Sequence, residues 1–450
     1  MASSGYGLPG RTSHDEAVER LDREQLAQHQ LARLRPMLDV LLAHNPFWRE
    51  RLRAVGLRGG ADIESLADFR RLPFLTKADL VADQEAYPPY GSNLTYPEEH
   101  YVRLLRTSGT TGRPLRWLET EESLTWGARN WVASFRAAGI GPSDRIFFAF
   151  SFGPFLAYWG AWEGARLLGA LAMSGGAMNS LERLHFLLDH RATVLACTPT
   201  YTLRLAEVAA EHGLDIRNSA VRRTIHGGEP GACIPSTKDR IEALWGARSC
   251  DTAGSTETGH WGYECLAARC DLHVEESEFI AEVIDPDTLA PVPPGTPGEL
   301  VLTNLGRWGM PVLRYRTRDR VIATEEPCDC GRTFLRLKGG VLGRTDDMLV
   351  VRGINVFPSA IENIVRQHGA VVEYEIEVRQ VRGMAELRLR LELAPDLQAA
   401  ESQQAVLHAV LGALHQQLHL RLDGEVVPPG TLPRYELKAR RVRIVAMGGP

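Results

Sequence analysis

The fold and function of the chain are predicted above all from one segment, Thr107-Ser108-Gly109-Thr110-Thr111-Gly112-Arg113-Pro114. Four hydroxyl side chains and two glycines fill its first six positions. Glycine lets the backbone approach a ligand closely, hydroxyls and N–H groups donate hydrogen bonds, and Arg113 adds a positive charge. The segment therefore favours a loop that binds an anion such as a polyphosphate. It is not a Walker A loop, because no Gly-Lys-Ser/Thr follows the glycines; an ordinary Ser/Thr/Gly surface turn is the alternative.

Length and composition indicate a globular protein of two or three domains. The 450 residues are 44% hydrophobic and 24% charged, as in ordinary globular chains. The 51 basic and 56 acidic residues leave a formal charge of −5, so we expect no nucleic-acid partner. Seven cysteines, an odd number, argue against a disulfide framework. They favour a reducing compartment, so a cytoplasmic location is expected.

One uncharged run, residues 146–162, approaches the length of a membrane span. Gly153-Pro154 interrupts it, so we expect a buried strand, a turn and the start of a buried helix, and no membrane partner. No signal peptide is expected. Residues 1–14 carry Gly, Ser and Pro without an apolar core and are expected to form a flexible tail.

Strands and helices are predicted to alternate after residue 120. The predicted strands are 145–150, 193–197 and 221–225, and the predicted helices are 123–138, 203–212 and 236–245. Such alternation predicts a largely parallel sheet packed by helices, with ligands at the carboxyl ends of the strands. Before it, residues 15–57 are predicted to be mostly helical, with a break at Pro36.

The predicted fold class is α/β, in two domains. A large N-terminal domain of residues 15–342, with β-sheets packed by helices, is followed by a small α+β C-terminal domain of residues 343–450. A Gly-rich stretch at 338–345 marks the junction. The C-terminal domain is predicted to contain strands at 348–351, 372–378 and 386–393 and helices at 358–368 and 397–418.

Four further segments carry groups that suit a nucleotide. Residues 251–259 form a second hydroxyl-rich turn, in which Glu257 offers the carboxylate that a magnesium ion bridging phosphates needs. Residues 314–319 place one carboxylate among three arginines, where it could accept two ribose hydroxyls or pair with an arginine. Residues 343–348 and 432–441 add cations. Taken alone, these two would be an interdomain linker and a solvated basic face.

In their order along the chain, these segments resemble the motifs of the adenylate-forming ligases, and within them those of the phenylacetate–CoA ligase group. The resemblance covers residues 30–445. It rests on Thr-Ser-Gly-Thr-Thr-Gly-Arg-Pro, His-Gly-Gly-Glu-Pro, Gly-Ser-Thr-Glu, Arg-Tyr-Arg-Thr-Arg-Asp, Gly-Arg-Thr-Asp-Asp-Met-Leu-Val-Val-Arg-Gly-Ile-Asn-Val-Phe-Pro and Leu-Pro-Arg-Tyr-Glu-Leu-Lys.

The resemblance implies a two-step reaction. A carboxylate attacks the α-phosphate of ATP to give an acyl adenylate and pyrophosphate, and the thiol of coenzyme A then displaces AMP. ATP, Mg²⁺ and coenzyme A are the implied cofactors, and a homodimer is expected from the family likeness. Three alternatives stay open: transfer to a carrier-protein thiol, transfer to an amine, or a non-catalytic relative that binds an adenine nucleotide.

The resemblance also assigns roles by position within these motifs. Thr107, Ser108, Gly109, Thr110, Thr111 and Gly112 would hold the β- and γ-phosphates, Thr256 would touch phosphate, and Glu257 would hold magnesium. Gly228, Glu229 and Pro230 would line the adenine pocket, Asp319 would bind the ribose, and Arg344 would lie beside the ribose and phosphate. Asp346 would be the hinge of a mobile C-terminal domain, and Lys438 would reach the carboxylate and the α-phosphate.

Three positions depart from the family pattern. Ala253 stands where a tyrosine often stacks on adenine, so stacking must come from elsewhere or be weaker. Arg113 replaces the more usual lysine, which keeps the charge and changes its geometry. Arg318 stands where a glycine is common, so the turn near the ribose is expected to have a different shape.

A structural zinc site is predicted from cysteine spacing. Cys328 and Cys330 form a Cys-x-Cys pair, and Cys265 and His273 lie upstream, so the four could form the Cys₃His tetrahedron of a closed zinc site. Part of the phenylacetate–CoA ligase group is similar here and carries such zinc. Cys270 or His260 could substitute for one ligand; reduced loop cysteines are the alternative. A closed site leaves no open position, which argues against a zinc hydrolase.

By resemblance, the acyl site lies among three turns. The candidate residues are Phe152, Phe155, Gly175, His226 and Gly227. Aromatic residues near these turns favour an aryl or arylacetic acid as the substrate, although the rings could equally belong to the core. The ring of His226 could touch a polar substituent of the acid or could only fill a turn.

Overall fold

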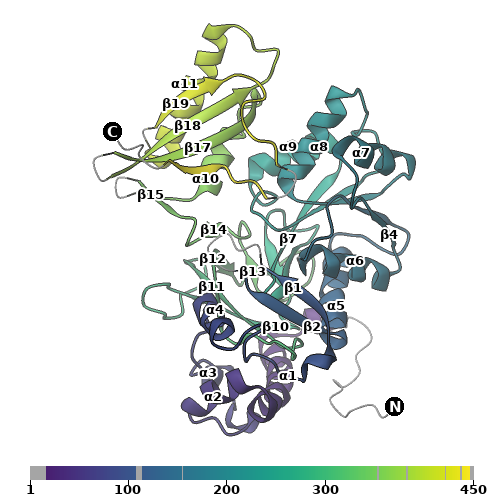
Figure 1. The fold of residues 1–450 in the computed structure, drawn as a ribbon, viewed down its shortest axis with the longest axis vertical. Helices are drawn as coiled ribbons and strands as arrows, with labels where there is room; N and C mark the ends of the chain where they lie inside the picture. Colours follow the sequence, from purple (N-terminus) through teal and green to yellow (C-terminus); the bar gives the residue numbers. More distant parts are fainter. Residues whose placement is uncertain are drawn as a thin grey trace.

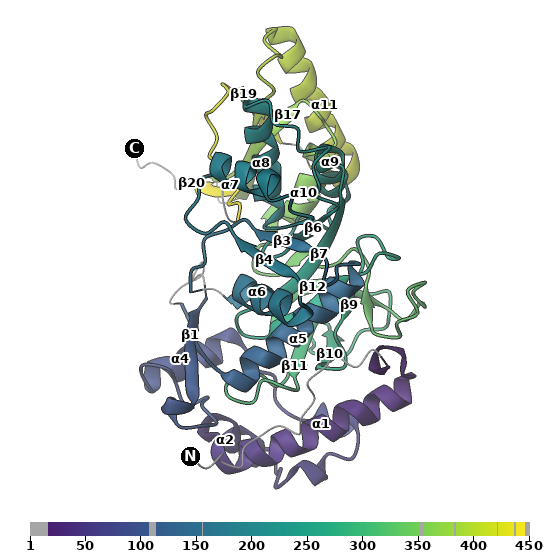
Figure 2. The same ribbon diagram turned by 90° about the vertical axis from the view of Figure 1, so that its right-hand side faces the viewer.

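The computed structural model describes residues 17–107, 114–154, 156–351, 354–381, 384–420, 422–435 and 438–445. Its long axis runs from a helical N-terminal part to a separate C-terminal sheet at the opposite end (Figures 1 and 2). A large sheet packed by helices fills the middle. The predicted α/β fold class, with a large sheet-and-helix domain and a small α+β domain, is confirmed.

The N-terminal part is helical. Its elements are η1 (Val18–Arg20), α1 (Arg23–His44), α2 (Pro46–Ala54), η2 (Gly60–Asp62), α3 (Leu66–Phe69), α4 (Lys77–Ala86) and η3 (Glu98–His100). The predicted break at Pro36 is wrong, because α1 continues through it. Leu34 and Met37 on either side are completely buried, and packing of this face outweighs the hydrogen bond that proline cannot make. The chain breaks at Asn45 instead, whose side chain caps α2.

A hairpin and the large sheet follow. The hairpin is formed by β1 (Tyr101–Arg106) and β2 (Arg116–Thr120). The sheet has twelve strands within the described residues, in the order β10-β11-β12-β13-β9-β8-β7-β6-β5-β3-β4, with β14 beside β12. The parallel strands are β3 (Arg145–Phe148), β4 (Leu171–Ser174), β5 (Val194–Ala196), β6 (Arg223–His226) and β7 (Arg248–Ser255).

The rest of the sheet is antiparallel. Its strands are β8 (Gly259–Glu264), β9 (Leu272–Val274), β10 (Phe279–Ile284), β11 (Pro297–Asn304), β12 (Tyr315–Thr324), β13 (Arg336–Leu337) and β14 (Gly343–Arg344). The chain therefore leaves the large sheet only after Arg344.

Helices cover both faces of the parallel half. They are α5 (Glu121–Ala137), α6 (Leu156–Leu168), α7 (Ser180–Asp189), α8 (Pro199–Glu211) and α9 (Pro235–Trp245). Ile146 and Phe148 of β3 pack with α5 and α6, whereas Phe147 between them packs with α7, α8 and α9. Alternate side chains of a strand point to opposite faces, so a strand covered on both faces is apolar throughout. The uncharged run 146–162 is thus β3, a turn and the start of α6, as predicted.

The C-terminal part forms its own sheet and core. Its elements are β15 (Leu349–Val351), β16 (Ile354–Val356), α10 (Pro358–Val365), β17 (Val371–Val381), β18 (Met384–Leu393), α11 (Ala400–Leu418), β19 (Asp423–Val427) and β20 (Val442–Val445). The sheet has the order β19-β18-β17-β20. Ile361, Leu389 and Val410 lie in the core between this sheet and its helices. Within the described residues, no helix is both long enough and apolar enough to cross a lipid bilayer.

Candidate active site

The glycine-rich loop begins and ends at a fixed base between β1 and β2. The amide of Thr107 donates to the carbonyl of Leu115 over 3.0 Å, and the Thr107 hydroxyl accepts from the Leu115 amide over 3.0 Å. Five of the predicted phosphate-binding residues, Ser108, Gly109, Thr110, Thr111 and Gly112, lie outside the described residues. The two ends of the loop are therefore held together next to the sheet.

The predicted adenine residues form the loop after β6. Gly228 has a φ of +92°, a conformation that favours glycine. Glu229 uses both carboxylate oxygens: Oε1 accepts from the Thr200 amide over 2.9 Å, and Oε2 accepts from the Ala439 amide over 2.7 Å. Burial raises the pKa of Glu229, although Arg441 opposes this. The loop is thus tied directly to the C-terminal part of the chain.

Lys438 lies at this same loop. A β-carbon placed on Gly228 would lie 3.5 Å from Cε of Lys438. Lys438 is an exposed residue. Burial of its ammonium group nevertheless lowers its pKa. The carboxylates of Glu229, Glu257 and Asp319 are close enough to act in the opposite direction. Charges that are far apart in sequence therefore act on one ammonium group.

Glu257 is held in the turn between β7 and β8. Its side chain is 7% exposed. The buried guanidinium of Arg307 donates to the carbonyls of Thr256 and Glu257 over 2.7 and 3.0 Å, and it pairs with buried Glu119. The two predicted phosphate-end residues, Thr256 and Glu257, thus have a fixed backbone. Sequence analysis missed Arg307 and Glu119, because single charged residues far apart carry no local motif.

Asp319 and Arg344 meet where β14 pairs with β12. NH1 of Arg344 lies 3.4 Å from Oδ1 of Asp319, and the same guanidinium binds both carboxylate oxygens of Asp346, over 2.9 and 3.0 Å. Burial raises the pKa of Asp319 to about 6, against the opposing charge of Arg344. The predicted ribose, phosphate and hinge residues therefore form one ion-pair network.

Arg318 adopts a conformation that a glycine would take. Its φ is +63°, its carbonyl accepts from the Thr345 amide over 2.8 Å, and its guanidinium lies 3.6 Å from Asp346. Arg318 thus stands in the left-handed region that favours glycine, and a different shape of the turn relative to the family stays a prediction. The arginine adds an ion pair to the segment that leads to the C-terminal domain.

Aromatic rings gather at the predicted acyl site. The ring of Phe152 lies 4.7 Å from that of Trp159 and 5.5 Å from that of Trp162, measured between centroids. Tyr158 stacks on Phe150 with a centroid distance of 3.6 Å and donates to the Gly227 carbonyl over 3.2 Å. Sequence analysis missed Tyr158, although it lies on the helix that follows the predicted Gly-Pro turn. Phe155 lies outside the described residues.

Two other predicted acyl-site residues are engaged in packing. The ring of His226 is 1% exposed; Nε2 bonds the Thr224 hydroxyl over 2.8 Å, and Nδ1 bonds the Cys197 carbonyl over 3.1 Å. Burial lowers the pKa of His226 to about 3. A β-carbon on Gly175 would lie 2.8 Å from the ring of Phe147. His226 is thus bonded within the sheet at the end of β6, and Gly175 leaves room for a core ring; their roles at the acyl site stay predictions.

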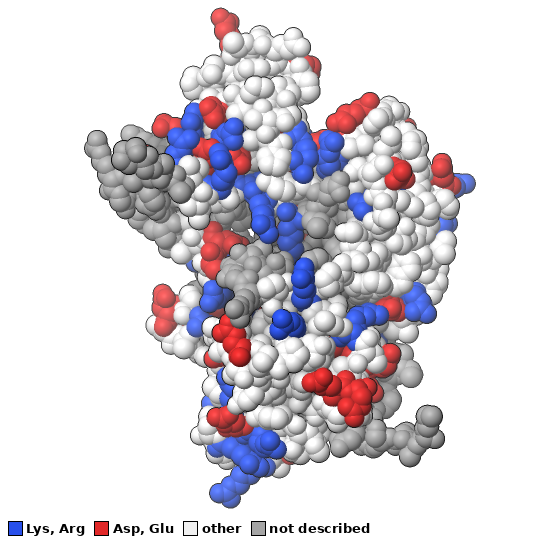
Figure 3. Space-filling model, viewed as in Figure 1, with Lys and Arg blue, Asp and Glu red and all other residues white. Residues whose placement is uncertain are grey.

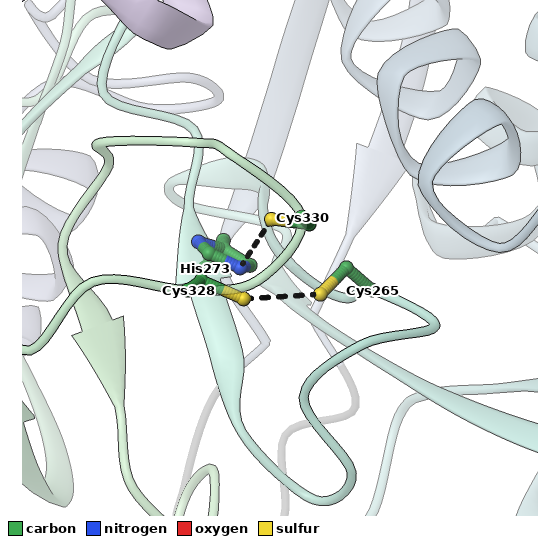
Figure 4. A group of neighbouring side chains, drawn as sticks. All are labelled: Cys265, His273, Cys328 and Cys330. Carbon is green, nitrogen blue, oxygen red and sulfur yellow. Dashed lines mark hydrogen bonds between the residues drawn. The ribbon is translucent and has the colours of Figure 1, made fainter.

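The predicted zinc ligands lie together (Figure 4), with Cys265 just after β8, His273 in β9, and Cys328 and Cys330 in the segment between β12 and β13. One potential ligand atom from each of Cys265, His273, Cys328 and Cys330 lies within 4.8 Å of the others. Cys265 and Cys328 sulfurs are 3.6 Å apart, and Cys330 Sγ lies 3.5 Å from His273 Nε2. Three thiols and an imidazole are the donor set of a structural zinc site, so the residues fit the metal.

The two substitute ligands lie elsewhere. His260 stacks on Trp131 with a centroid distance of 3.8 Å and bonds the Ser134 hydroxyl over 2.6 Å. Cys270 lies beside Cys233, and both thiols are free. Neither belongs to the cluster of four.

The face that carries these loops is positively charged along its middle. Lys and Arg side chains form a band from the C-terminal sheet towards β1 and β2 (Figure 3). Such a band attracts anionic ligands.

Two families match the chain. Residues 61–306 match the family of AMP-binding enzymes, and residues 353–443 match the AMP-binding enzyme C-terminal domain. The phenylacetate-coenzyme A ligase of Thermus thermophilus is 33% identical over 445 residues, covering 94% of this chain and 98% of that protein. The phenylacetate-coenzyme A ligase of Escherichia coli is 32% identical over 435 residues, covering 95% and 96%.

A solved structure extends the comparison. A 2-hydroxyisobutyryl-CoA ligase in the postadenylation state, in complex with 2-HIB-AMP, superimposes with a TM-score of 0.91 at 29% identity, covering 99% of this chain and 95% of that one. The same ligase in the thioesterification state gives a TM-score of 0.72, covering 98% and 95%. Our chain therefore superimposes more closely on the former structure than on the latter.

The chain belongs to the AMP-binding enzymes, which form adenylates. Within them it belongs to the phenylacetate–CoA ligase group. It is an AMP-forming acid–CoA ligase, which adenylates a carboxylic acid with ATP and then transfers the acyl group to coenzyme A.

Proposed function

We propose that the chain activates an aromatic carboxylic acid, aryl or arylacetic, as its CoA thioester. The carboxylate oxygen attacks the α-phosphorus of ATP, the bond to the β-phosphate oxygen breaks, and pyrophosphate leaves with the electron pair. The thiolate of coenzyme A then attacks the acyl carbon and AMP leaves. The observation that carries the proposal is the position of Lys438 beside Gly228, with Glu229, Glu257 and Asp319 around it.

Adenylation requires two anions to approach each other. The ammonium group of Lys438 supplies positive charge where the carboxylate meets the α-phosphate, and fixed N–H donors add to it. Arg344 would sit by the ribose and phosphate, and Asp319 would accept the ribose hydroxyls. Holding the reactants in one geometry lowers the barrier further.

Magnesium would bind at Glu257. Its carboxylate is nearly buried and its backbone is held by Arg307. Glu257 would therefore offer Mg²⁺ a fixed oxygen ligand beside the phosphates of ATP. When bound, Mg²⁺ neutralises phosphate charge. Thr107 at the loop base, together with Ser108 to Gly112, would hold the β- and γ-phosphates. Gly228, Glu229 and Pro230 would line the adenine.

The C-terminal domain would rotate between the two steps. Asp346 is the proposed hinge, at the segment where β14 leaves the large sheet. The difference between the two states of the 2-hydroxyisobutyryl-CoA ligase supports this, because the same chain superimposes so differently on them. Rotation would withdraw Lys438 and admit the thiol.

The aromatic acid is supported by the rings at Phe150, Phe152, Tyr158 and Trp162. The Cys₃His cluster would hold a structural zinc ion that ties the loop after β12 to β8 and β9. The homodimer and the cytoplasmic location stay predictions from family likeness and cysteine usage. Size-exclusion chromatography with light scattering tests the first.

The test is acid-dependent exchange of pyrophosphate into ATP. Benzoate, phenylacetate and 2-hydroxyisobutyrate are compared, and AMP release is followed with and without coenzyme A. We expect exchange with an aromatic acid and coenzyme A-dependent AMP release. Lys438→Ala should lower exchange about 100-fold or more. Exchange with only the aliphatic acid would refute the aromatic substrate, and thioester formation that needs a carrier protein would refute coenzyme A as the acceptor.

A further inference from the structure

A second lysine reaches the active site from the N-terminal helices. Nζ of Lys77 lies 3.4 Å from Oε1 of Glu257. The Lys77 side chain is 30% exposed and that of Glu257 is 7% exposed. The proposed catalytic lysine, Lys438, comes from the C-terminal part of the chain and lies beside Gly228, whereas Lys77 is the first residue of α4. Lys77 therefore gives the phosphate end of the site a cation of its own.

The backbone before Lys77 is fixed to the large sheet. The amide of Leu75 donates to the Arg314 carbonyl over 3.0 Å, and the Arg316 amide donates to the Leu75 carbonyl over 2.9 Å. These bonds pair the segment with the start of β12, the strand that carries Asp319. The backbone next to Lys77 is therefore held by β12, the strand that also carries Asp319, the proposed ribose-binding residue.

A capping box then makes Lys77 the first residue of α4. The Thr76 hydroxyl accepts from the Asp79 amide, and the Asp79 carboxylate accepts from the Thr76 amide over 2.8 Å. This arrangement holds the start of a helix firmly. The position of the Lys77 backbone is therefore determined independently of Glu257.

The other end of α4 holds the base of the glycine-rich loop. Nε2 of Gln84 donates to the Arg116 carbonyl over 2.7 Å, and Oε1 accepts from the Arg116 amide over 3.0 Å. A cavity of about 430 Å³ lies between α4 and this base, lined in part by Val81, Pro114 and Leu115. One helix thus connects the loop base to the carboxylate of Glu257.

Glu257 does not need Lys77 to be positioned. Arg307 already holds its carbonyl and that of Thr256. The ammonium group of Lys77 is therefore available for a ligand. It is a compact charge with three hydrogen-bond donors on a flexible side chain, and such a group binds phosphate oxygens well.

We propose that Lys77 binds the β- and γ-phosphates of ATP and stabilises pyrophosphate as it leaves. This rests on the proposed function and adds a second residue to it. The bond that breaks joins the α-phosphorus to the bridging oxygen, and its electron pair stays with pyrophosphate. Lys77 offsets that charge at one end, while Lys438 serves the α-phosphate at the other. No proton is transferred.

The half-reactions test this role, because an acyl adenylate has no β- or γ-phosphate. Lys77→Met keeps the stem and removes the charge. We expect kcat/KM for ATP in the exchange assay to fall about 10- to 100-fold, as for loss of a charged hydrogen bond. Conversion of supplied acyl adenylate and coenzyme A to thioester should stay unchanged. Lys77→Arg should recover part of the loss. Lys338→Met removes an exposed lysine that pairs with Glu326 and should match the wild type.

A binding measurement separates this role from catalysis. Thermal protection by ATP and by AMP is compared without magnesium; Lys77→Met should lose the extra protection by ATP and keep that by AMP. If the wild type exchanges no pyrophosphate, the proposed function fails, and the ratio of ATP to AMP protection still decides on Lys77. Equal loss of both half-reactions, or an unchanged ratio, would show that Lys77 only supports the fold.

Discussion

The amide of Ala439 and the carboxylate of Glu229 are joined by a 2.7 Å hydrogen bond, which links the residue after Lys438 to the loop after β6. The other oxygen of Glu229 accepts from the Thr200 amide. One carboxylate therefore holds the C-terminal part of the chain against the large sheet, in the arrangement that resembles a postadenylation state.

Glu229→Gln is expected to weaken this arrangement. A carboxamide has only one acceptor oxygen, and its NH₂ group would face one of the two amides, which costs about 1–3 kcal/mol. Pyrophosphate exchange should fall about tenfold or more, whereas thioester formation from supplied acyl adenylate should fall less. Glu326→Gln, at an exposed glutamate, is the control. An equal loss in both half-reactions would contradict the role of Glu229 in the first arrangement.

Arg318→Gly is expected to change the balance between the two steps. Glycine relieves a left-handed backbone that costs an arginine about 1–2 kcal/mol, but it removes the ion pair with Asp346. Thermal stability should change little, and thioester formation should speed up relative to adenylation by a few-fold. Arg318→Asn tolerates this backbone and lacks the charge. If the asparagine variant behaves like the wild type, the ion pair has no part in the effect.

Zinc removal is expected to destabilise the protein more than it affects ATP binding. Purified protein should contain one zinc ion per chain by elemental analysis, and Cys330→Ser should lose it and melt several degrees lower, because metal binding adds to folding stability. Cys270→Ser, outside the cluster, should keep the metal. If the purified protein contains no metal and is fully stable, the Cys₃His cluster is not a zinc site.

Stability of the C-terminal domain is expected to depend on Glu373. Burial opposes its ionisation, but Arg441 and Arg366 lower its pKa from 4.5 to about 2. Because the folded pKa lies below the unfolded one, Glu373 stabilises the fold above pH 4.5, by about 3 kcal/mol, and this is lost as the pH falls from 4.5 towards 2. Urea unfolding of wild type and Glu373→Gln should differ at pH 7 and converge near pH 2. A constant difference would exclude this titration.

Features that depend on neighbouring residues in the sequence could be predicted, and features that depend on tertiary contacts could not. The apolar run of β3 and the alternation after it gave the sheet, because parallel strands buried on both faces are apolar throughout. The cysteine spacing pointed to four residues that do lie together. The continuation of α1 through Pro36 depended on tertiary burial that one segment does not display.

Contacts across the chain explain the residues that were missed. Lys77 comes from α4 and Arg307 from the segment between β11 and β12. Both meet Glu257 through tertiary contacts, and neither belongs to a motif. His226 is the opposite case. It stands in a motif, but its partners, Thr224 and Cys197, belong to the sheet interior.

The buried pair of Arg307 and Glu119 has a consequence for protein engineering. The match to the AMP-binding enzyme family ends at residue 306, one position before Arg307. A chimera spliced at that boundary would transplant Glu119 and the Glu257 turn without Arg307. If the recipient supplies no arginine there, Glu119 would lose its ion pair in the interior and keep only the hydrogen bond from the Ser123 hydroxyl. Modules exchanged between relatives should therefore be cut beyond β12.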